Sequence, residues 1–140
     1  MLFQHGPIGA LVLLFDGEGR LLLLKPSYRR DDLWSLPGGF SRRSESPTET
    51  AVREAREELG IAIRVTALLA EGRGEFGEVS FACAGERIDP TARIGLSAEH
   101  SEWRWFALDA LPPLGSRIAD LLSRSLDRRA ALQAGAQRRA

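Results

Sequence analysis

The segment that decides the fold runs from Gly39 to Ile61 and reads GFSRRSESPTETAVREAREELGI. Near its end Glu54, Glu57 and Glu58 are three and four residues apart, so a helix would direct their carboxylates toward one volume of space. Like charges at this spacing destabilise a helix, and a bound Mg²⁺ or Mn²⁺ would offset the repulsion because these ions prefer carboxylate oxygens. Arg53 can offset part of it by pairing with Glu57. Taken alone, however, such a run more often marks a solvated helix face.

Signals for both ends of a helix surround the glutamates. Ser46-Pro47-Thr48-Glu49 combines a serine N-cap, a proline at the first helical position and a glutamate three residues after the cap, which is the capping-box arrangement. Gly60 supplies the C-terminal stop. The apolar stripe between these ends consists of Ala51, Val52, Ala55 and Leu59. One side of this helix is therefore predicted to be buried, with the acidic residues along its flank.

The spacing of the whole segment adds a second signal. Gly39, five residues, Glu45, seven residues and then REAREELGI at 53–61 resemble the Nudix box of the Nudix hydrolases, G-x5-E-x7-R-E-U-x-E-E-x-G-U, where U is aliphatic. Every fixed position is matched, although Ala55 is small for an aliphatic position. The resemblance implies an α/β fold, the Nudix-type α/β/α sandwich with a mixed sheet and a strand-loop-helix unit at the box.

The resemblance also implies a reaction. Nudix hydrolases cleave a diphosphate bond in a nucleoside diphosphate linked to another group, such as a nucleoside triphosphate or a nucleotide sugar, by attack of water on phosphorus. The chain is therefore expected to be a metal-dependent pyrophosphohydrolase with Mg²⁺ as cofactor, for which Mn²⁺ can substitute. The alternative is a Nudix-fold sensor that binds a nucleotide without cleaving it, and the intact glutamate cluster favours the enzyme.

Roles carried over from the family fall on residues of the box. Glu57 and Glu58 correspond to the main metal ligands. Glu54 corresponds to a further ligand or the general base, and Arg53 to the residue that orients it. The carbonyl of Gly38 is expected to be another ligand.

Three positions near or beyond the box are less firmly placed by the resemblance. Glu99 is the candidate for an extra ligand or base from a later loop, with Glu102 as the competing choice. Glu45 is expected to have a weaker, structural role. Many relatives have glycine where this chain has Ser44, so if the turn needs a positive φ the loop geometry must differ.

Candidate substrate contacts lie in loops around the box. Arg29, Arg30 and Arg42 are candidates for binding a substrate phosphate, although solvated loop arginines are the more common case. Phe76, in a predicted turn, is a candidate for stacking on a base. His100 is isolated and shares no metal-ligand spacing with the glutamates. The tryptophans are expected to be mainly core residues, and they are Trp34, Trp103 and Trp105.

The remaining pattern outlines the other elements. Apolar runs at 8–15 and 21–25 flank the turn cluster at 16–20, which predicts two paired strands in a hairpin. Gly38-Gly39 is expected to form a tight bend. Further strands are predicted at 34–36, 61–69, 78–84 and 103–108, a loop at 89–102 and a second helix at 116–132.

Length and composition favour one domain over residues 1–132, followed by a frayed tail at 133–140. Nineteen basic residues balance nineteen acidic ones, which gives no reason to expect nucleic-acid or membrane partners; the expected partner is a small nucleotide substrate. Cys83 is the only cysteine, so a cytoplasmic, reducing location is expected. The apolar N-terminal segment reads as a buried strand. Both a monomer and a homodimer remain open.

The substrate itself is not specified by the sequence. Relatives selective for ADP-ribose often have a proline where Gly77 stands, and those selective for dinucleoside polyphosphates tend to have a tyrosine where Val79 stands. A nucleoside triphosphate is the default expectation.

Overall fold

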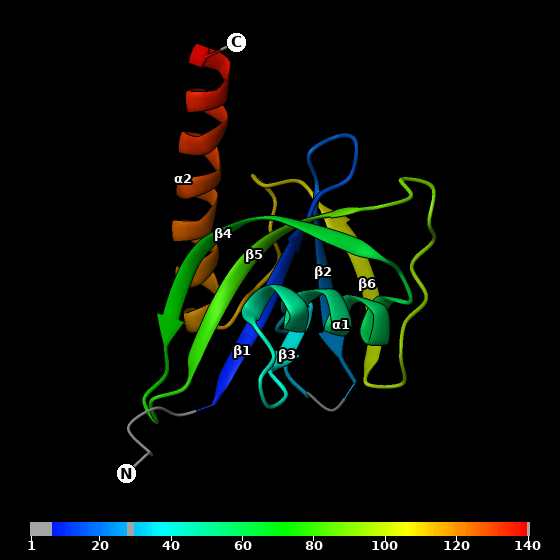
Figure 1. Cartoon of the computed structure of the whole chain (residues 1–140). Helices are drawn as coiled ribbons and strands as arrows, with labels where there is room; N and C mark the ends of the chain where they lie inside the picture. The colour runs from blue at the N-terminus through cyan, green and yellow to red at the C-terminus, as the bar shows by residue number, and fades with distance from the viewer. Residues whose placement is uncertain (1–6, 28–29, 140) are drawn as a thin grey trace.

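The computed structural model describes residues 7–27 and 30–139. Three strands and a helix are followed by three more strands and a second helix (Figure 1). In order they are β1 (Ile8–Leu14), β2 (Leu21–Pro26), β3 (Gly38–Phe40), α1 (Pro47–Leu59), β4 (Ile63–Arg73), β5 (Val79–Arg87), β6 (His100–Phe106) and α2 (Ser116–Arg139).

The strands form a mixed four-stranded sheet and an antiparallel pair. The larger sheet has the order β3-β1-β5-β4, in which β1 and β5 are parallel and the other neighbours antiparallel, while β2 pairs with β6. The predicted hairpin between the first two strands is wrong, because only Phe15 and Leu21 form a bridge at its turn. Both edges of β1 are already occupied by β3 and β5, so β2 joins a strand that lies far away in the sequence.

The short strand before α1 also differs from the prediction. It forms at Gly38–Phe40, where a bend was expected, whereas Trp34 and Ser35 make only isolated bridges. Gly38 has φ 151°, and a Cβ there would collide with the Ala10 carbonyl oxygen and lie 2.8 Å from the Cα of Leu11. Glycine thus allows β3 to approach β1 closely.

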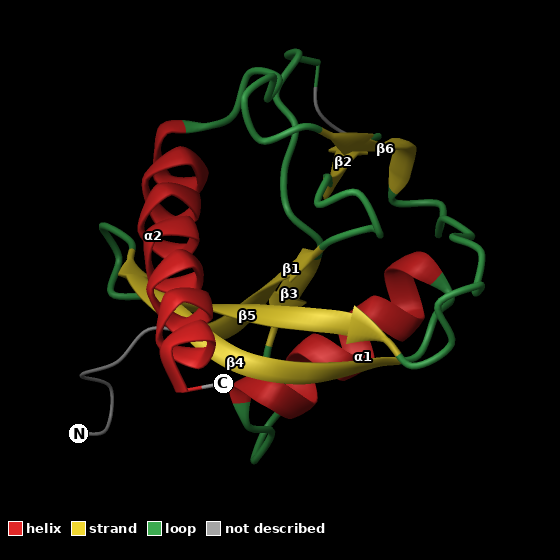
Figure 2. Cartoon of the chain, turned by 90° about the horizontal axis from the view of Figure 1, so that it is seen from above, coloured by secondary structure: helices red, strands yellow, loops and turns green. Residues whose placement is uncertain are grey.

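The larger sheet is covered on both faces (Figures 1 and 2). One apolar cluster includes Val12 and Leu14 of β1 with Ala55 and Leu59 of α1; the other includes Leu13 with Leu121 and Leu122 of α2. Because successive residues of a strand point to opposite faces, the alternation along β1 places α1 and α2 on opposite sides of the sheet. The predicted sandwich with a mixed sheet is confirmed.

The ends of α1 match the prediction in detail. The Ser46 side chain accepts a hydrogen bond from the Glu49 N–H at 3.1 Å, and the Glu49 carboxylate accepts one from the Ser46 N–H at 2.9 Å. Gly60 closes the helix with φ 67°, a left-handed conformation that favours glycine. The capping box is thus formed on both sides and fixes the helix that carries the glutamates.

Later boundaries shift relative to the sequence prediction. β4 continues to Arg73, β6 begins at His100 inside the predicted loop, and α2 continues through residues 133–139, which were expected to fray. The end of α2 extends past the sheet (Figure 1), and most of its last residues are exposed. Among the described residues, no helix is long and apolar enough to cross a membrane.

The loop between β3 and α1 contains a strained residue. Ser44 adopts φ 68°, the one positive φ among the described non-glycine residues. The loop therefore keeps the turn that glycine forms easily, and its geometry does not change to suit serine. The left-handed conformation costs a residue with a Cβ about 1–2 kcal/mol.

Replacing Ser44 with glycine is expected to stabilise the protein. The relief of strain exceeds the added entropy of the unfolded chain, so Ser44→Gly should raise the free energy of unfolding by about 0.5–1 kcal/mol. Urea denaturation measures the change. Arg43→Gly is the matched control, since Arg43 lies next in the same loop without a positive φ; it should be neutral or destabilising. Equal stabilisation by both variants would contradict the strain at Ser44.

Candidate active site

Arg53 is the centre of a polar network on α1. Its Nε and Nη2 donate to the two oxygens of Glu45 at 2.7 and 2.9 Å, and its Nη1 donates to Glu54 at 2.8 Å and to Glu57 at 3.1 Å. Nη2 also donates to the Phe40 carbonyl at 2.9 Å. One guanidinium therefore links β3, the loop and the helix. These carboxylates raise the pKa of Arg53 further above its already high value, so its charge is permanent.

Glu45 belongs to this scaffold. The Arg53 guanidinium, followed by the Arg42 backbone N–H, holds the pKa of Glu45 at about 2. Its carboxylate also accepts a hydrogen bond from the Thr50 hydroxyl at 2.9 Å. Because its oxygens are used to fix the loop against α1, the geometry supports the structural role expected for Glu45.

Glu58 has a different environment from the other box glutamates. It is buried, and its Oε1 accepts a hydrogen bond from the Gly38 N–H at 2.7 Å. Burial raises its pKa to about 8, in opposition to the Gly38 hydrogen bond, and the nearby carboxylates of Glu54, Glu99 and Glu57 raise it further. No arginine pairs with Glu58 among the described residues. The site therefore concentrates negative charge around one buried carboxyl group.

The segment that carries Glu99 is anchored on two sides. The N–H groups of Gly95 and Ser97 donate to the carbonyls of Leu59 and Glu58 at 2.8 and 3.1 Å, so the segment caps the end of α1. On the other side, the Ser27 N–H donates to the Glu99 carbonyl at 2.9 Å. These bonds hold the segment over Glu58.

This placement separates Glu99 from Glu102. Glu99 lines the same cleft as Glu58, whereas Glu102 pairs with Arg104 at 2.6 Å on β6 and does not line it. The cleft has a volume of about 250 Å³. Its walls come from β1, β3, the end of α1 and the start of β6, and the residues that matter here are Gly38, Gly39, Glu58, Glu99 and His100.

Glycines make room for the acidic groups. A Cβ on Gly39 would lie 2.7 Å from the Glu54 carboxylate, so a larger residue there would displace the Glu54 side chain. Gly38 both lines the cleft and donates to Glu58. The metal-ligand role expected for the Gly38 carbonyl stays a prediction.

The acidic groups suit a hard cation by their chemistry. Carboxylates are the ligands that Mg²⁺ and Mn²⁺ prefer, and Glu58 lies within electrostatic range of three others. Among the described residues, however, no group of three or more His, Cys, Asp or Glu side chains is arranged to hold a metal ion. Arg53 engages Glu54 and Glu57, while Glu58 turns toward Gly38. Binding a cation would require Glu54 or Glu57 to turn away from Arg53.

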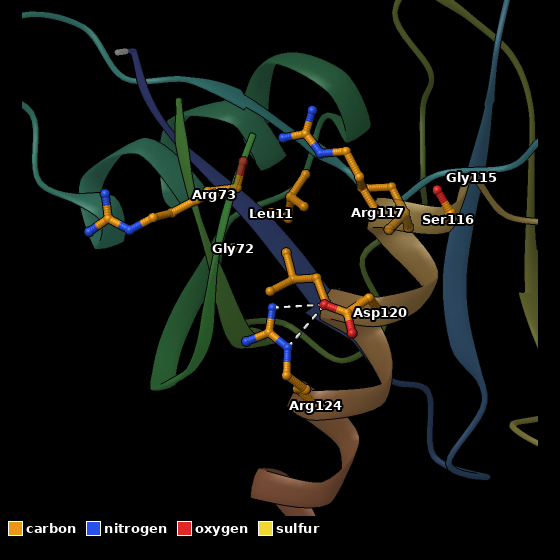
Figure 3. A pocket seen from close by; sticks show the side chains of 11 residues that line it. Leu11, Gly72, Arg73, Gly115, Ser116, Arg117, Asp120 and Arg124 are labelled. Atoms are coloured by element: carbon orange, nitrogen blue, oxygen red, sulfur yellow. Dashed lines mark hydrogen bonds and ion pairs between the residues drawn. The ribbon is translucent and has the colours of Figure 1, made fainter. Parts of the chain in front are cut away.

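A second, larger cavity of about 540 Å³ lies between the sheet and α2. It shares Leu11 and Ser80 with the cleft, so the two form neighbouring parts of one surface. Arg117 and Arg124 lie on either side of Leu11 in the view of Figure 3. Arg117 pairs with Glu78 at 2.9 Å, and Arg124 pairs with Asp120 at 3.1 Å. The apolar lining comes from Leu11, Ile118 and Leu121.

Only some of the residues that were predicted to contact substrate lie near the acidic site. Arg42 donates to Glu57 at 3.0 Å and so belongs to the acidic site. Arg30 and Phe76 line neither cavity, and the Phe76 side chain is largely exposed in the β4–β5 turn. Arg29 lies outside the described residues. The tryptophans expected in the core are buried or half-buried, with Trp34 and Phe106 in an edge-to-face contact.

The sequence interpretation missed His100. Its Nε2 lies 3.4 Å from Glu58 Oε2, although the residues are 42 positions apart. Burial lowers the pKa of His100. The one feature of the sequence that could have pointed to His100 is its position next to Glu99, which was itself a candidate site residue. The cavity beside α2 was also missed, because its arginines are far apart in the sequence and look like solvated helix residues.

Known proteins resemble this chain in sequence and structure. A putative ADP-ribose pyrophosphatase, YjhB of Bacillus subtilis, is 31% identical over 110 residues, which are 71% of this chain and 50% of that protein. An RNA pyrophosphohydrolase of Novosphingobium aromaticivorans is 28% identical over 126 residues, 74% of this chain and 78% of that protein. This chain therefore spans only half the length of the Bacillus relative.

Solved structures agree with the fold. A UDP-X diphosphatase superposes with a TM-score of 0.79 at 22% identity, over 94% of this chain and 66% of that one. A MutT protein from Methanosarcina mazei superposes with a TM-score of 0.74 at 27% identity, over 93% and 99%. The family model described as NUDIX domain matches residues 6–124, which include all the strands, α1 and the beginning of α2. The chain belongs to the NUDIX domain family.

Proposed function

We propose that the protein hydrolyses a diphosphate bond in a nucleoside diphosphate linked to another group, with Mg²⁺ as cofactor and Mn²⁺ as a substitute. The observation that carries the proposal is the buried Glu58, which faces a cleft with three further carboxylates in electrostatic range and no arginine partner among the described residues. Such a site attracts a divalent cation, and a cation there attracts a diphosphate. Membership of the family supports the reaction class.

The cation, when bound, would neutralise diphosphate oxygens and increase the acidity of a water molecule. Glu57 and Glu58 are proposed as its main ligands, with Glu54 and the Gly38 carbonyl as further candidates. Arg53 holds Glu54 and Glu57 near Glu58 by direct hydrogen bonds, and at least one of the two would turn from Arg53 to the cation when it binds. Arg42, which contacts Glu57, is proposed to bind a substrate phosphate.

Glu99 is proposed as the general base that accepts a proton from the attacking water. It lines the cleft, and its side chain has no ion pair with an arginine among the described residues, whereas Glu54 is paired with Arg53 at 2.8 Å. A carboxylate oxygen that already accepts a hydrogen bond from a guanidinium is less available to accept a proton from water. Glu54 remains the competing candidate.

The cavity beside α2 is proposed to receive the part of the substrate that lies beyond the diphosphate. It adjoins the cleft through Leu11 and Ser80 and combines apolar residues with arginines, a lining that suits a planar, partly polar group. The relatives carry names for different substrates, ADP-ribose and RNA among them. We therefore propose a diphosphate-containing nucleotide as the substrate class and do not single out one nucleotide.

The setting of the enzyme is part of the same proposal. A cytoplasmic location agrees with Cys83, which is buried as a free thiol whose pKa is raised by burial to about 11. A small nucleotide is the proposed partner, and the protein is proposed to act as a monomer or homodimer.

The main test is a panel of nucleoside triphosphates, nucleotide sugars, ADP-ribose, dinucleoside polyphosphates and 5′-triphosphorylated RNA, with Mg²⁺ or Mn²⁺. At least one should be hydrolysed only with metal. Glu57→Gln and Glu58→Gln should lower kcat/KM roughly 100-fold or more, since the cation is worth several kcal/mol in the transition state. Glu102→Gln, outside the cleft, should retain activity. Metal-dependent nucleotide binding without turnover by the wild type would favour the sensor instead.

The raised pKa of Glu58 predicts a pH-dependent stability without metal. Between the ordinary pKa of 4.5 and about 8, the folded protein retains a proton that the unfolded chain has lost, so stability should fall as pH rises through this window. Thermal unfolding in EDTA should show the fall, and Mg²⁺ should diminish it by favouring the ionised carboxylate. Glu58→Gln should lose this component, with Glu102→Gln as control. Identical pH profiles for Glu58→Gln and wild type would contradict the assignment.

The choice of base is tested by Glu99→Gln and Glu54→Gln. If Glu99 is the base, its removal should lower kcat roughly 10²–10⁴-fold with little change in Mn²⁺ affinity. Glu54→Gln should weaken Mn²⁺ binding as well. Steady-state kinetics and Mn²⁺ titration by electron paramagnetic resonance provide the two measurements. A full loss of kcat in Glu54→Gln with unchanged Mn²⁺ affinity, and an active Glu99→Gln, would reverse the assignment.

A further inference from the structure

His100, the first residue of β6, lies beside Glu58 at the end of α1. The imidazole and the Glu58 carboxylate are both almost fully enclosed, with exposed fractions of 9% and 8% for the two side chains. His100 Nε2 lies 3.4 Å from Glu58 Oε2, while the Gly38 N–H donates to Oε1 at 2.7 Å. Each oxygen of Glu58 therefore has a nitrogen from a different strand beside it, the Gly38 N–H of β3 at Oε1 and His100 Nε2 of β6 at Oε2.

The surroundings of the other ring nitrogen, Nδ1, indicate which nitrogen of His100 carries the proton. Nδ1 is buried and has no hydrogen-bond partner in the described part of the chain. A proton on Nδ1 would thus be buried without an acceptor, which is costly. A proton on Nε2, by contrast, faces a carboxylate oxygen. The Nε2–H form is the one that the surroundings of the ring favour.

The backbone holds His100 in this position. Its own N–H donates to the Ser97 carbonyl at 3.3 Å, and the Ser97 N–H donates to the carbonyl of Glu58 itself at 3.1 Å. His100 is also paired with Pro26 of β2 at the end of the β2–β6 ladder. The main chain of His100 is therefore fixed relative to both the end of α1 and β2, and the enclosed imidazole lies against Glu58.

We propose that His100 is a positioning residue, which donates a hydrogen bond from Nε2 to Glu58 and so holds that carboxylate in the orientation that binds the divalent cation. The inference rests on the proposed role of Glu58 as a ligand. A hydrogen bond to one lone pair of a carboxylate restricts its rotation and leaves its other lone pairs available, which is how outer residues tune metal affinity in proteins. His100 itself neither binds the metal nor touches the reacting atoms.

The test measures Mn²⁺ affinity without substrate, by electron paramagnetic resonance of free Mn²⁺, together with kcat, KM and Tm. His100→Leu keeps an apolar volume but has no donor, and it should weaken Mn²⁺ binding roughly 10- to 100-fold. His100→Gln can place an amide N–H near the position of Nε2 and should recover most of the affinity. The matched control is Ser101→Ala, which removes a hydrogen bond of Ser101 to the Lys25 carbonyl on the same pair of strands and should leave Mn²⁺ binding unchanged.

A double-mutant cycle separates positioning from a general loss of structure. In a Glu58→Gln background, His100→Leu should have no further effect on Mn²⁺ affinity, because the residue through which it acts is gone. If His100→Leu fails to fold, His100→Asn takes its place. The shorter asparagine amide does not reach Glu58, so this variant should bind Mn²⁺ as weakly as predicted for His100→Leu.

The outcomes distinguish this inference from the proposed function. Wild-type affinity in His100→Leu, or equal loss in His100→Gln and His100→Leu, overturns the positioning role while leaving metal-dependent hydrolysis intact. A His100-dependent affinity for Mn²⁺ in a protein that hydrolyses nothing in the panel supports the positioning role and removes the proposed reaction. A wild type that binds no Mn²⁺ overturns both.

Discussion

The hydrogen bond from the Gly38 N–H to the Glu58 carboxylate, 2.7 Å long, is the constraint on which the rest of the site depends. It joins β3 to the last turn of α1 and buries a carboxyl group where water cannot solvate it. The bond requires a backbone that passes close to both β1 and α1. A Cβ on Gly38 would collide with the β1 backbone, and one on Gly39 would displace the Glu54 carboxylate. The two glycines before α1 and the glutamate near its end therefore form one structural unit.

Two kinds of carboxylate follow from this arrangement. Arg53 pairs with the ionised Glu45 carboxylate and holds its pKa at about 2. Burial instead raises the pKa of Glu58 to about 8. Groups whose environments separate their pKa values in this way commonly have separate tasks. Arg53 stabilises the framework by fixing the loop against the helix. Glu58, without a guanidinium partner among the described residues, is left as the group that gains most from a cation.

The sequence predicted the helix and its caps because those depend on local rules. Ser46, Glu49 and Gly60 act within a few residues of one another, and the structure forms each of their interactions. Strand pairing was harder to predict, since β1 joins β3 and β5 instead of its neighbour in the sequence. The tight approach at Gly38 is a tertiary effect, and two glycines in a row are equally compatible with a bend. His100 was overlooked for the same reason, because only the fold brings it to Glu58.

The central claim, that a divalent cation binds at the buried glutamate, is tested most directly by anomalous diffraction. Crystals grown with Mn²⁺ and measured at the manganese absorption edge would locate the ion without relying on activity. The account predicts an anomalous peak in the cleft with Glu58 in direct coordination and at least one of Glu54 and Glu57 turned away from Arg53 to join it. A manganese ion bound elsewhere, with Glu58 still directed at the Gly38 N–H and no density beside it, would contradict the account.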